Sequence, residues 1–292
     1  MARSGDPLPG IENATFNSFN IIDSNAQGQV LVFTESIVDG IGGIGNSGYW
    51  RWNDHQLEMI VQEGLALPTG GEVVDSLWYA KMNTMGTVAY QVGSTTATLY
   101  VFDDLNGHSF VASPTSLTAQ FGLNVNFIGI PVMNRHGQIA FGSLLSSNGI
   151  AEDVFDALFA TGRDGTIHQI VQSGDIIEVA EGDQRTVQWI YYARDSGGDD
   201  GQRMSLNDRG ELVYRVQFGD GSGGIFVATI DPIICPGDVT YDFEIDVDDL
   251  NVVLSSWSKS VTPGTAGDVD GTGFVDVDDL NLVLGAWGTV CN

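Results

Sequence analysis

The chain is short of positive charge, of cysteine and of long apolar runs. Its 292 residues include 11 lysines and arginines against 38 aspartates and glutamates, a net charge of −27 at pH 7. Because so acidic a surface repels phosphate backbones and anionic headgroups, we expect no nucleic-acid partner. No segment approaches the ~18 apolar residues of a spanning helix, so we expect no membrane span. The four histidines lack metal-ligand spacing, which argues against a zinc site.

The two cysteines, Cys235 and Cys291, bracket a short acidic segment. In a cytosolic protein they would be free thiols. At the borders of one small module a disulfide is the stronger expectation, because it staples the two ends together. In the chain-entropy model such a bond stabilises by roughly 4 kcal/mol. It implies an oxidising compartment, so we expect an extracellular or cell-surface protein whose signal peptide is absent from this chain.

The acidic residues are unevenly spread along the chain. The segment Cys235–Asn292 carries 11 acids and one base, a net charge of −10, and the preceding residues carry 27 acids and 10 bases, a net of −17. Carboxylates crowded into a short segment repel one another unless a cation sits among them. We therefore predict two domains, a β-repeat domain over residues 1–231 and an acidic domain over residues 232–292.

The first domain contains four copies of a unit marked by Asn-x-x-Gly and a β-prone run. The four asparagines are spaced by 58, 51 and 73 residues, and they are Asn25, Asn83, Asn134 and Asn207. Asparagine suits the first position of a type I turn, where its side chain can bond the backbone ahead, and glycine suits the last. The motif predicts a hairpin turn in each copy.

Further short strands follow each turn, with no helical periodicity. An aromatic-rich strand comes next, as in Gly48–Trp52, and then a strand that ends at glycine, as in Gln56–Gly64. The fourth copy lacks this last strand, and the N-terminal Ser4–Pro9 looks like the end of one. Four repeated units of about four antiparallel strands are typical of propeller blades, with a solenoid or a twisted multi-hairpin sheet as alternatives. We predict a mainly β, propeller-like repeat domain followed by a small α-helical calcium-binding module.

These copies resemble a bacterial repeat family with the signature Asn-x-x-Gly-x-x-Ala-Phe, which segment Asn134–Phe141 matches. The resemblance covers most of residues 1–231. It implies an extracellular or surface setting and no known chemistry. Members of the family occur beside C-terminal surface-sorting or dockerin modules.

The acidic domain contains two frames with the spacing of calcium ligands. An EF-hand-type loop takes its ligands from positions 1, 3, 5, 7, 9 and 12, with glycine at position 6. The second frame supplies Asp268, Asp270, Thr272, the carbonyl of Phe274, Asp276 and Asp279, with Gly273 at position 6. The first supplies Asp238, Thr240, Asp242, the carbonyl of Glu244, Asp246 and Asp249. Phe243 takes its glycine position at a cost of about 1 kcal/mol, so we expect two calcium ions and a weaker first site.

A short amphipathic segment follows each loop, and the two copies are in register, Leu250–Trp257 with Leu280–Trp287. This duplicated half-EF-hand resembles the dockerin module. The resemblance implies calcium-dependent folding and docking onto a cohesin-type partner, through loop positions 10 and 11. Both copies carry a Val-Asp pair there, in place of the hydroxyl pair common in cellulosomal dockerins: Val247, Asp248, Val277 and Asp278. Two identical pairs would allow docking in two orientations related by a half-turn.

We therefore predict an extracellular, non-catalytic binding or scaffold protein, tethered through a calcium-dependent dockerin-like module to a cohesin-type or surface partner. Trp50 and Trp52 share one face of a strand. If exposed they would stack on a glycan, although such aromatics more often pack between blades. The alternative is a secreted polysaccharide-degrading hydrolase or carbohydrate-binding module. No pair of carboxylates stands out as acid and nucleophile, so we predict no catalytic residue.

Overall fold

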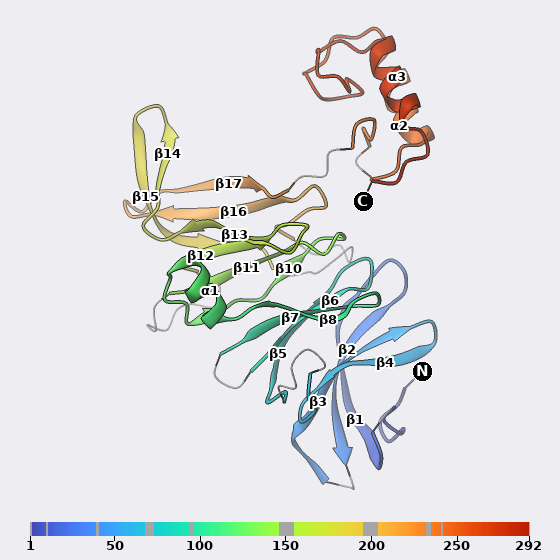
Figure 1. The fold of residues 1–292 in the computed structure, drawn as a ribbon, viewed down its shortest axis with the longest axis vertical. Coiled ribbons are helices and arrows are strands. Elements are labelled where there is room, and N and C mark those ends of the chain that lie inside the picture. Colours follow the sequence, from blue (N-terminus) through green and yellow to red (C-terminus); the bar gives the residue numbers. More distant parts are fainter. Residues whose placement is uncertain are drawn as a thin grey trace. The chain divides into compact units, whose positions relative to one another are not determined.

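The computed structural model describes residues 2–9, 11–38, 41–67, 73–93, 96–145, 155–194, 204–231, 235–240 and 242–291. The chain divides into two compact units, Met1–Ile230 and Asp231–Asn292. The first is built mainly of strands and the second of two short helices and their loops (Figure 1). Over the described ranges, no helix has the length and apolarity needed to cross a membrane.

Four antiparallel sheets, one for each repeat, make up the first unit. Sheet 1 contains β1 (Ala14–Ser24), β2 (Val30–Val38), β3 (Ile41–Asn53) and β4 (Gln56–Gln62), and sheet 2 contains β5 (Leu77–Met82), β6 (Val88–Val92), β7 (Thr98–Asp103) and β8 (Gly107–Ala112). Sheet 3 contains β9 (Phe127–Ile128), β10 (Val132–Met133), β11 (Ile139–Leu144), β12 (Ala157–Thr161) and β13 (Ile167–Gln172). Sheet 4 contains β14 (Ile176–Ala180), β15 (Asp183–Tyr191), β16 (Glu211–Phe218) and β17 (Gly223–Thr229). The predicted mainly β, antiparallel class is confirmed.

Neighbouring sheets share their cores, because alternate residues of a strand point to opposite faces. Tyr90 of β6 packs with sheet 1, whereas its neighbour Ala89 packs with sheet 3. In the same way Phe159 of β12 packs with sheet 2 and Leu158 packs with sheet 4. Every residue of β6 and of β12 is buried. These two inner strands therefore lack the alternation of buried and exposed residues that a half-buried strand shows.

The asparagine of each repeated turn bonds its own backbone, as the sequence predicts. Asn25 Oδ1 accepts hydrogen bonds from the backbone N–H groups of Gln27 at 3.2 Å and Gln29 at 3.0 Å. The N–H of Gly28, which has φ 79°, donates to the Asn25 carbonyl at 3.0 Å. The same pattern recurs at the other three turns.

The amide nitrogen of each asparagine also bonds the next turn, which the sequence does not reveal. Asn25 Nδ2 donates to the carbonyl of Asn83 at 3.2 Å, and Asn83 Nδ2 donates to the carbonyl of Asn134 at 2.9 Å. Asn134 Nδ2 donates to the carbonyl of Asn207 at 3.0 Å. Asn207 is exposed, and its Nδ2 donates to Glu211 at 2.7 Å within the same turn. We call this head-to-tail row of bonds, which runs through sheets 1 to 4, the asparagine ladder.

The N-terminal segment covers the outer face of sheet 1. Gly5 N–H donates to the Phe16 carbonyl at 2.7 Å, in the way that Gly174 N–H donates to the Val187 carbonyl at 2.9 Å in sheet 4. Ser4–Pro9 thus lies beside β1 in the same way that the residues just after β13 lie beside β15. Beneath it lies Trp50, fully buried and edge-on to Phe16 at 5.6 Å between ring centroids.

Trp50 and Trp52, the two tryptophans considered for sugar stacking, lie in two different environments. Trp50 packs under the N-terminal segment rather than between two sheets. Trp52 is half-buried and edge-on to His55 at 6.5 Å. The pair of them does not form an exposed aromatic platform.

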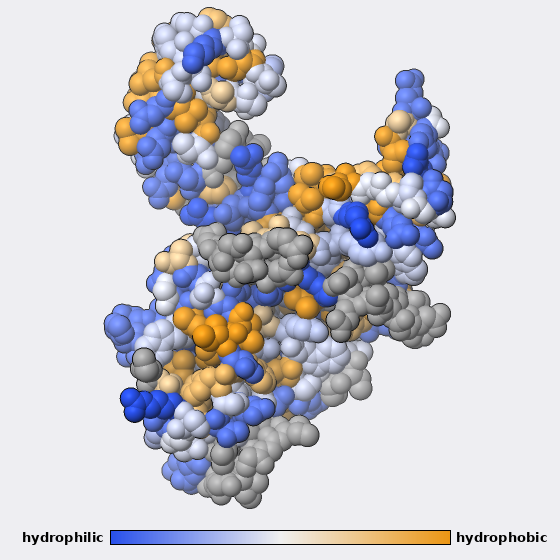
Figure 2. Space-filling model, turned by 180° about the vertical axis from the view of Figure 1, so that it is seen from behind, coloured by the Kyte–Doolittle hydropathy of each residue, from blue (hydrophilic) through white to orange (hydrophobic). Residues whose placement is uncertain are grey.

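Among the described residues of the first unit, no further strand covers the outer face of sheet 4. As expected, the fourth repeat has no strand after β17 among the described residues, so β17 is an edge strand. Hydrophobic side chains gather on its outer face, where Ile225 is 76% exposed and Val227 59% exposed. Figure 2 shows them as an orange band along β17. Sheet 4 therefore differs from sheet 1, whose outer face the N-terminal segment covers.

One helix of the first unit, α1 (Pro114–Phe121), was not anticipated. Ser113 caps its N-terminus in a capping box with Ser116, proline occupies its first turn, and Gly122 ends it at φ 71°. Leu117 is fully buried against sheets 2 and 3. The Ser-Pro start and glycine stop are helix signals, but eight residues are too few to reveal a helical period.

The second unit contains α2 (Val247–Ser255) and α3 (Val277–Gly285), which pack against each other. Both begin three residues earlier than the predicted segments, because Asp246 and Asp276 cap their N-termini. Val253 and Val283 are fully buried in the shared core. Cys235 and Cys291 form a disulfide, with Cα atoms 6.0 Å apart, so the predicted pairing is confirmed.

Candidate metal centre

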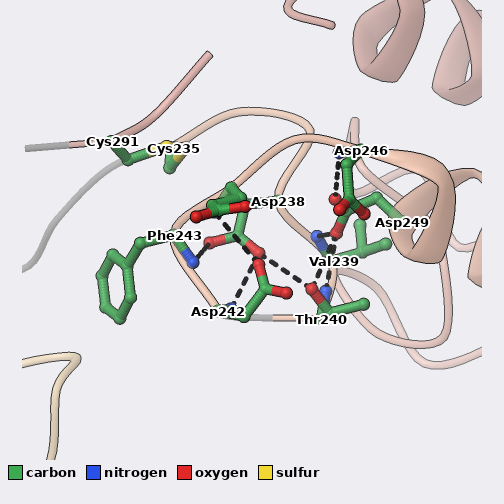
Figure 3. The surroundings of a disulfide bond; sticks show 10 residues. Cys235, Asp238, Val239, Thr240, Asp242, Phe243, Asp246, Asp249 and Cys291 are labelled. Carbon is green, nitrogen blue, oxygen red and sulfur yellow. Dashed lines mark hydrogen bonds between the residues drawn. A yellow bond between two sulfur atoms is a disulfide. The ribbon is translucent and has the colours of Figure 1, made fainter. Parts of the chain in front are cut away.

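Three carboxylates converge in each of the two loops of the second unit. In the first loop, carboxylate oxygens of Asp238, Asp242 and Asp249 all lie within 4.8 Å of one another. They come from positions 1, 5 and 12 of the predicted frame (Figure 3). In the second loop the corresponding group is Asp268, Asp270 and Asp279, also within 4.8 Å. Both clusters contain the carboxylates of positions 1 and 12. The third carboxylate comes from position 5 in the first loop and from position 3 in the second.

The backbone at position 6 explains how each loop closes. Gly273 has φ 83° and Phe243 has φ 70°, so both loops turn through the left-handed region at the same point. Phenylalanine adopts this conformation at a cost of about 1 kcal/mol. Its ring points away from the carboxylates and is 4% exposed in the hydrophobic core of the unit (Figure 3). Burial of the ring offsets the strained backbone.

Position 8 anchors each loop to the same core. Ile245 is 1% exposed and Val275 is fully buried. Their backbones also cross-link the unit, since Ile245 N–H donates to Thr289 O at 3.0 Å and Val275 N–H donates to Lys259 O at 3.0 Å. The carboxylates are therefore presented by a loop fixed at its midpoint.

The twelfth-position carboxylates are fully buried and accept backbone hydrogen bonds. Asp249 Oδ1 accepts from Val239 N–H at 2.8 Å, and its Oδ2 accepts from Asp246 N–H at 2.9 Å. Asp279 makes the same bonds to Val269 at 2.7 Å and to Asp276 at 2.8 Å. Each carboxylate thus ties the start of the loop to the start of the following helix.

The first-position carboxylates are also buried. Asp268 Oδ2 accepts from the N–H groups of Gly264 at 2.8 Å and Gly273 at 2.9 Å. Burial opposes ionisation, but these bonds outweigh it and hold the pKa of Asp268 below its ordinary value. Asp268 is consequently ionised at neutral pH, as a metal ligand must be.

The other predicted side-chain ligands lie close to the clusters or cap the following helices. Thr240 Oγ1 donates to Asp249 Oδ1 at 3.0 Å, and Thr272 Oγ1 donates to the Phe274 carbonyl at 3.3 Å. Asp246 and Asp276 are the helix caps, accepting from Asp248 N–H at 2.8 Å and Asp278 N–H at 2.9 Å. Glu244 lies in a bridge with Val290.

The donor set fits a hard divalent cation. Each loop gathers three carboxylates, whose mutual repulsion an ion would relieve. The single base of the unit, Lys259, donates from Nζ to the Ser255 carbonyl at 2.7 Å. All side-chain donors are oxygens, the type that calcium prefers to nitrogen or sulfur.

The predicted partner-contact residues occupy equivalent places on the two helices. Val247 and Val277 are the first residues of α2 and α3, and each is 53% exposed. Asp248 and Asp278 follow them and are also exposed. The two Val-Asp pairs therefore present the same side chains in the same local geometry.

Part of the first unit is similar to a known family. Residues 110–232, less than half of the chain, match the model of a family of unknown function, DUF7453. No curated protein matches the chain. Among solved structures, a luciferin-regenerating enzyme is 12% identical, covering 76% of this chain and 63% of its own, with a TM-score of 0.32. A putative gluconolactonase is 12% identical, covering 80% and 88% with a TM-score of 0.26. A mutant of AofleA from Arthrobotrys oligospora is 14% identical, covering 80% and 66% with a TM-score of 0.30.

The chain spans less than two thirds of the luciferin-regenerating enzyme and of AofleA. At these TM-scores the similarities support no conclusion about architecture or activity.

Proposed function

We propose that this chain is an extracellular, non-catalytic binding or scaffold protein, in which a propeller-like β unit is tethered by a dockerin-like unit. The second unit would take two calcium ions and dock onto a cohesin-type or surface partner. The observation that carries the proposal is the duplication of one carboxylate cluster, with the same buried aspartates at positions 1 and 12 of both loops.

Calcium would act by fixing the loops to the helices. Asp238, Asp242 and Asp249 would hold one ion, and Asp268, Asp270 and Asp279 the other, with further oxygens from the neighbouring loop residues. Because the twelfth-position aspartates also bond the helix caps, an ion bound there would order the N-termini of α2 and α3. These N-termini carry Val247 and Val277, so calcium binding would shape the docking surface.

The disulfide supports the extracellular part of the proposal. Disulfides persist in oxidising compartments and are rare in the cytosol. Cys235 precedes the first loop and Cys291 lies at the end of the unit. Cys291 N–H donates to the Phe243 carbonyl at 2.8 Å, so the staple is linked directly to the turn of the first loop.

Calorimetric titration of the whole chain with calcium tests the proposal. We expect two binding events, one lost in Asp268→Ala and the other in Asp238→Ala, together with a calcium-dependent rise in melting temperature. The first site should be the weaker, because Phe243 stands where glycine stands in the second.

Asp248→Ala and Asp278→Ala are matched controls, since each removes an exposed carboxylate one residue beyond a helix cap. Both should retain the two calcium events. Absence of heat in the wild type, with a melting temperature indifferent to calcium and chelator, would contradict the calcium-dependent tether.

A further inference from the structure

The outer face of sheet 4, which turns away from sheet 3, presents apolar side chains from its last two strands. Val213 of β16 lies opposite Val227 of β17, and Arg215 of β16 lies opposite Ile225 of β17. The residues that alternate with them form the core shared with sheet 3, so these four side chains point away from it. Ile225 is 76%, Val227 59% and Val213 43% exposed.

In the other three sheets, the next sheet covers the position equivalent to Val213. Val213 lies six residues after the asparagine of its turn, Asn207. The residues six places after the other three asparagines are Leu31, Ala89 and Ala140, and each is fully buried. They pack with sheets 2, 3 and 4, respectively. The outer face of sheet 4 is therefore equivalent to the face by which each earlier sheet packs on the next one.

This face carries no net charge, although the chain as a whole has a net charge of −27. The outward residues of β16 and β17 include one acid, Glu211, and one base, Arg215, on either side of Val213. Strand β17 (Gly223–Thr229) contains no charged residue. Edge strands usually carry charges or proline, which discourage pairing with another chain. A neutral, apolar edge on so acidic a chain is typical of a surface that another protein covers.

The two charged side chains of the face are held in place. The Arg215 guanidinium lies over the Tyr191 ring of β15, with Cζ 4.0 Å from the ring centroid. The Tyr191 hydroxyl donates to Gln217 Oε1 at 3.2 Å. Glu211 accepts from Asn207 Nδ2 at 2.7 Å. Because neither charge moves freely in solvent, a partner that pairs with them loses less entropy.

The sheet that best complements this face is sheet 4 of a second copy. The outer face of sheet 1 is already covered by its own N-terminal segment. Asn207 bonds Glu211 within its own turn, so the asparagine ladder needs no further Asn-x-x-Gly turn beyond sheet 4. A half-turn about the row formed by Val213 and Val227 exchanges the two sides of that row. It places Glu211 of each copy opposite Arg215 of the other.

We propose that two copies of this chain pair through the outer faces of sheet 4, with Val213, Ile225 and Val227 at the centre of the contact and two Glu211–Arg215 pairs at its edges. Such a two-fold contact closes after two copies and forms a dimer rather than a filament. The inference goes beyond the calcium-dependent tether and stands without it, because every residue involved belongs to the first unit.

Sedimentation equilibrium of the whole chain in chelator tests the proposal apart from the calcium loops. A series from about 1 to 200 µM covers the range of weak dimers. Ile225→Lys should weaken dimerisation at least ~10-fold, because it buries two unpaired charges in the contact. Ile21→Lys on β1 is the matched control, since Ile21 is also 76% exposed, and it should dimerise as wild type.

A charge exchange tests the orientation of the two copies. Arg215→Glu and Glu211→Lys should each dimerise at least ~10-fold more weakly than wild type, because each places like charges opposite one another. An equal mixture of the two variants should dimerise more tightly than either alone, since the opposite charges then face one another again. Their melting temperatures show that both variants are folded.

Three results would overturn the proposal. One is a wild-type chain that stays monomeric up to about 200 µM, beyond which a contact is too weak to be specific. Another is a dimer that Ile225→Lys and Ile21→Lys affect equally, which would place the contact elsewhere. The third is a mixture of the charge variants that dimerises no better than either alone, which would exclude the half-turn arrangement.

Discussion

Asparagine begins each repeated turn because its amide combines an acceptor with two donors on a short side chain. The oxygen accepts from two N–H groups of its own turn, and in the first three turns the nitrogen donates to a carbonyl of the next turn. Aspartate could make the first set of bonds but not the second. Asn83 and Asn134 are 0% and 1% exposed, so water cannot replace a lost partner there.

Replacement of a ladder asparagine should therefore cost more inside the row than at its end. We expect Asn83→Ala to lower the free energy of unfolding of the first unit by about 2–3 kcal/mol, because it strands buried polar groups. Asn207→Ala, which removes the same turn bonds at an exposed site, should cost less than about 1 kcal/mol. Urea unfolding followed by tryptophan fluorescence measures both, and equal losses would mean that the bonds between turns contribute nothing.

Hydrogen bonds within a turn could be predicted from the sequence, whereas hydrogen bonds between turns could not. The turn at Asn25 follows from the sequence because its bonds reach only two to four residues ahead. Its bond to the Asn83 carbonyl joins residues 58 apart. No local pattern specifies that partner, which is fixed only when the two sheets pack. The groove of the first unit that Arg135, His136 and Arg163 help to line was missed for the same reason, although the Arg135-His136 pair in an acidic chain was a visible signal.

Among the elements, the two loop-helix copies of the second unit follow most directly from the sequence. Their frames, glycine position and helices all depend on short spacings. The helices begin three residues before the predicted segments, because Asp246 and Asp276, which are also predicted ligands, cap their N-termini. A capping box and a metal site place aspartates in overlapping positions, so spacing alone does not distinguish them.

Two glycine-to-alanine changes in the second unit should have opposite effects. Gly273→Ala forces a side chain onto φ 83° and should destabilise the unit by about 1 kcal/mol. Gly285→Ala, in the last position of α3 with open space around it, should stabilise it by about 0.5 kcal/mol. Thermal unfolding in chelator measures both without calcium. Effects of the same sign would show that the left-handed turn does not control this loop.

At the scale of the whole molecule, the two units are stabilised in different ways. The first relies on cores shared between successive sheets and on the asparagine ladder. The second has a small core, so its disulfide and any bound ions carry more of its stability. Hence the two units should respond separately to reduction and to chelator.

Removal of the disulfide by Cys235→Ser with Cys291→Ser should test that separation. In the chain-entropy model the bond, which joins residues 56 apart, contributes roughly 4 kcal/mol. We expect the melting transition of the second unit to shift strongly downward and that of the first unit to stay in place. Scanning calorimetry of the whole chain measures both, and a parallel shift of the two would contradict independent folding.

The sequence by itself determined the features that depend on near neighbours: the repeated hairpin turns, the antiparallel β class, the duplicated acidic loops and the cysteine pair at the module borders. Only the tertiary structure decided what each repeat touches. It turned the Asn-x-x-Gly turns into a ladder, buried Trp50 under the N-terminal segment and left Ile225 and Val227 of β17 exposed. It also gathered Arg135, His136 and Arg163 into one groove. The physical reason is that contacts across sheets join residues dozens of positions apart, and packing of two faces, not local propensity, selects them.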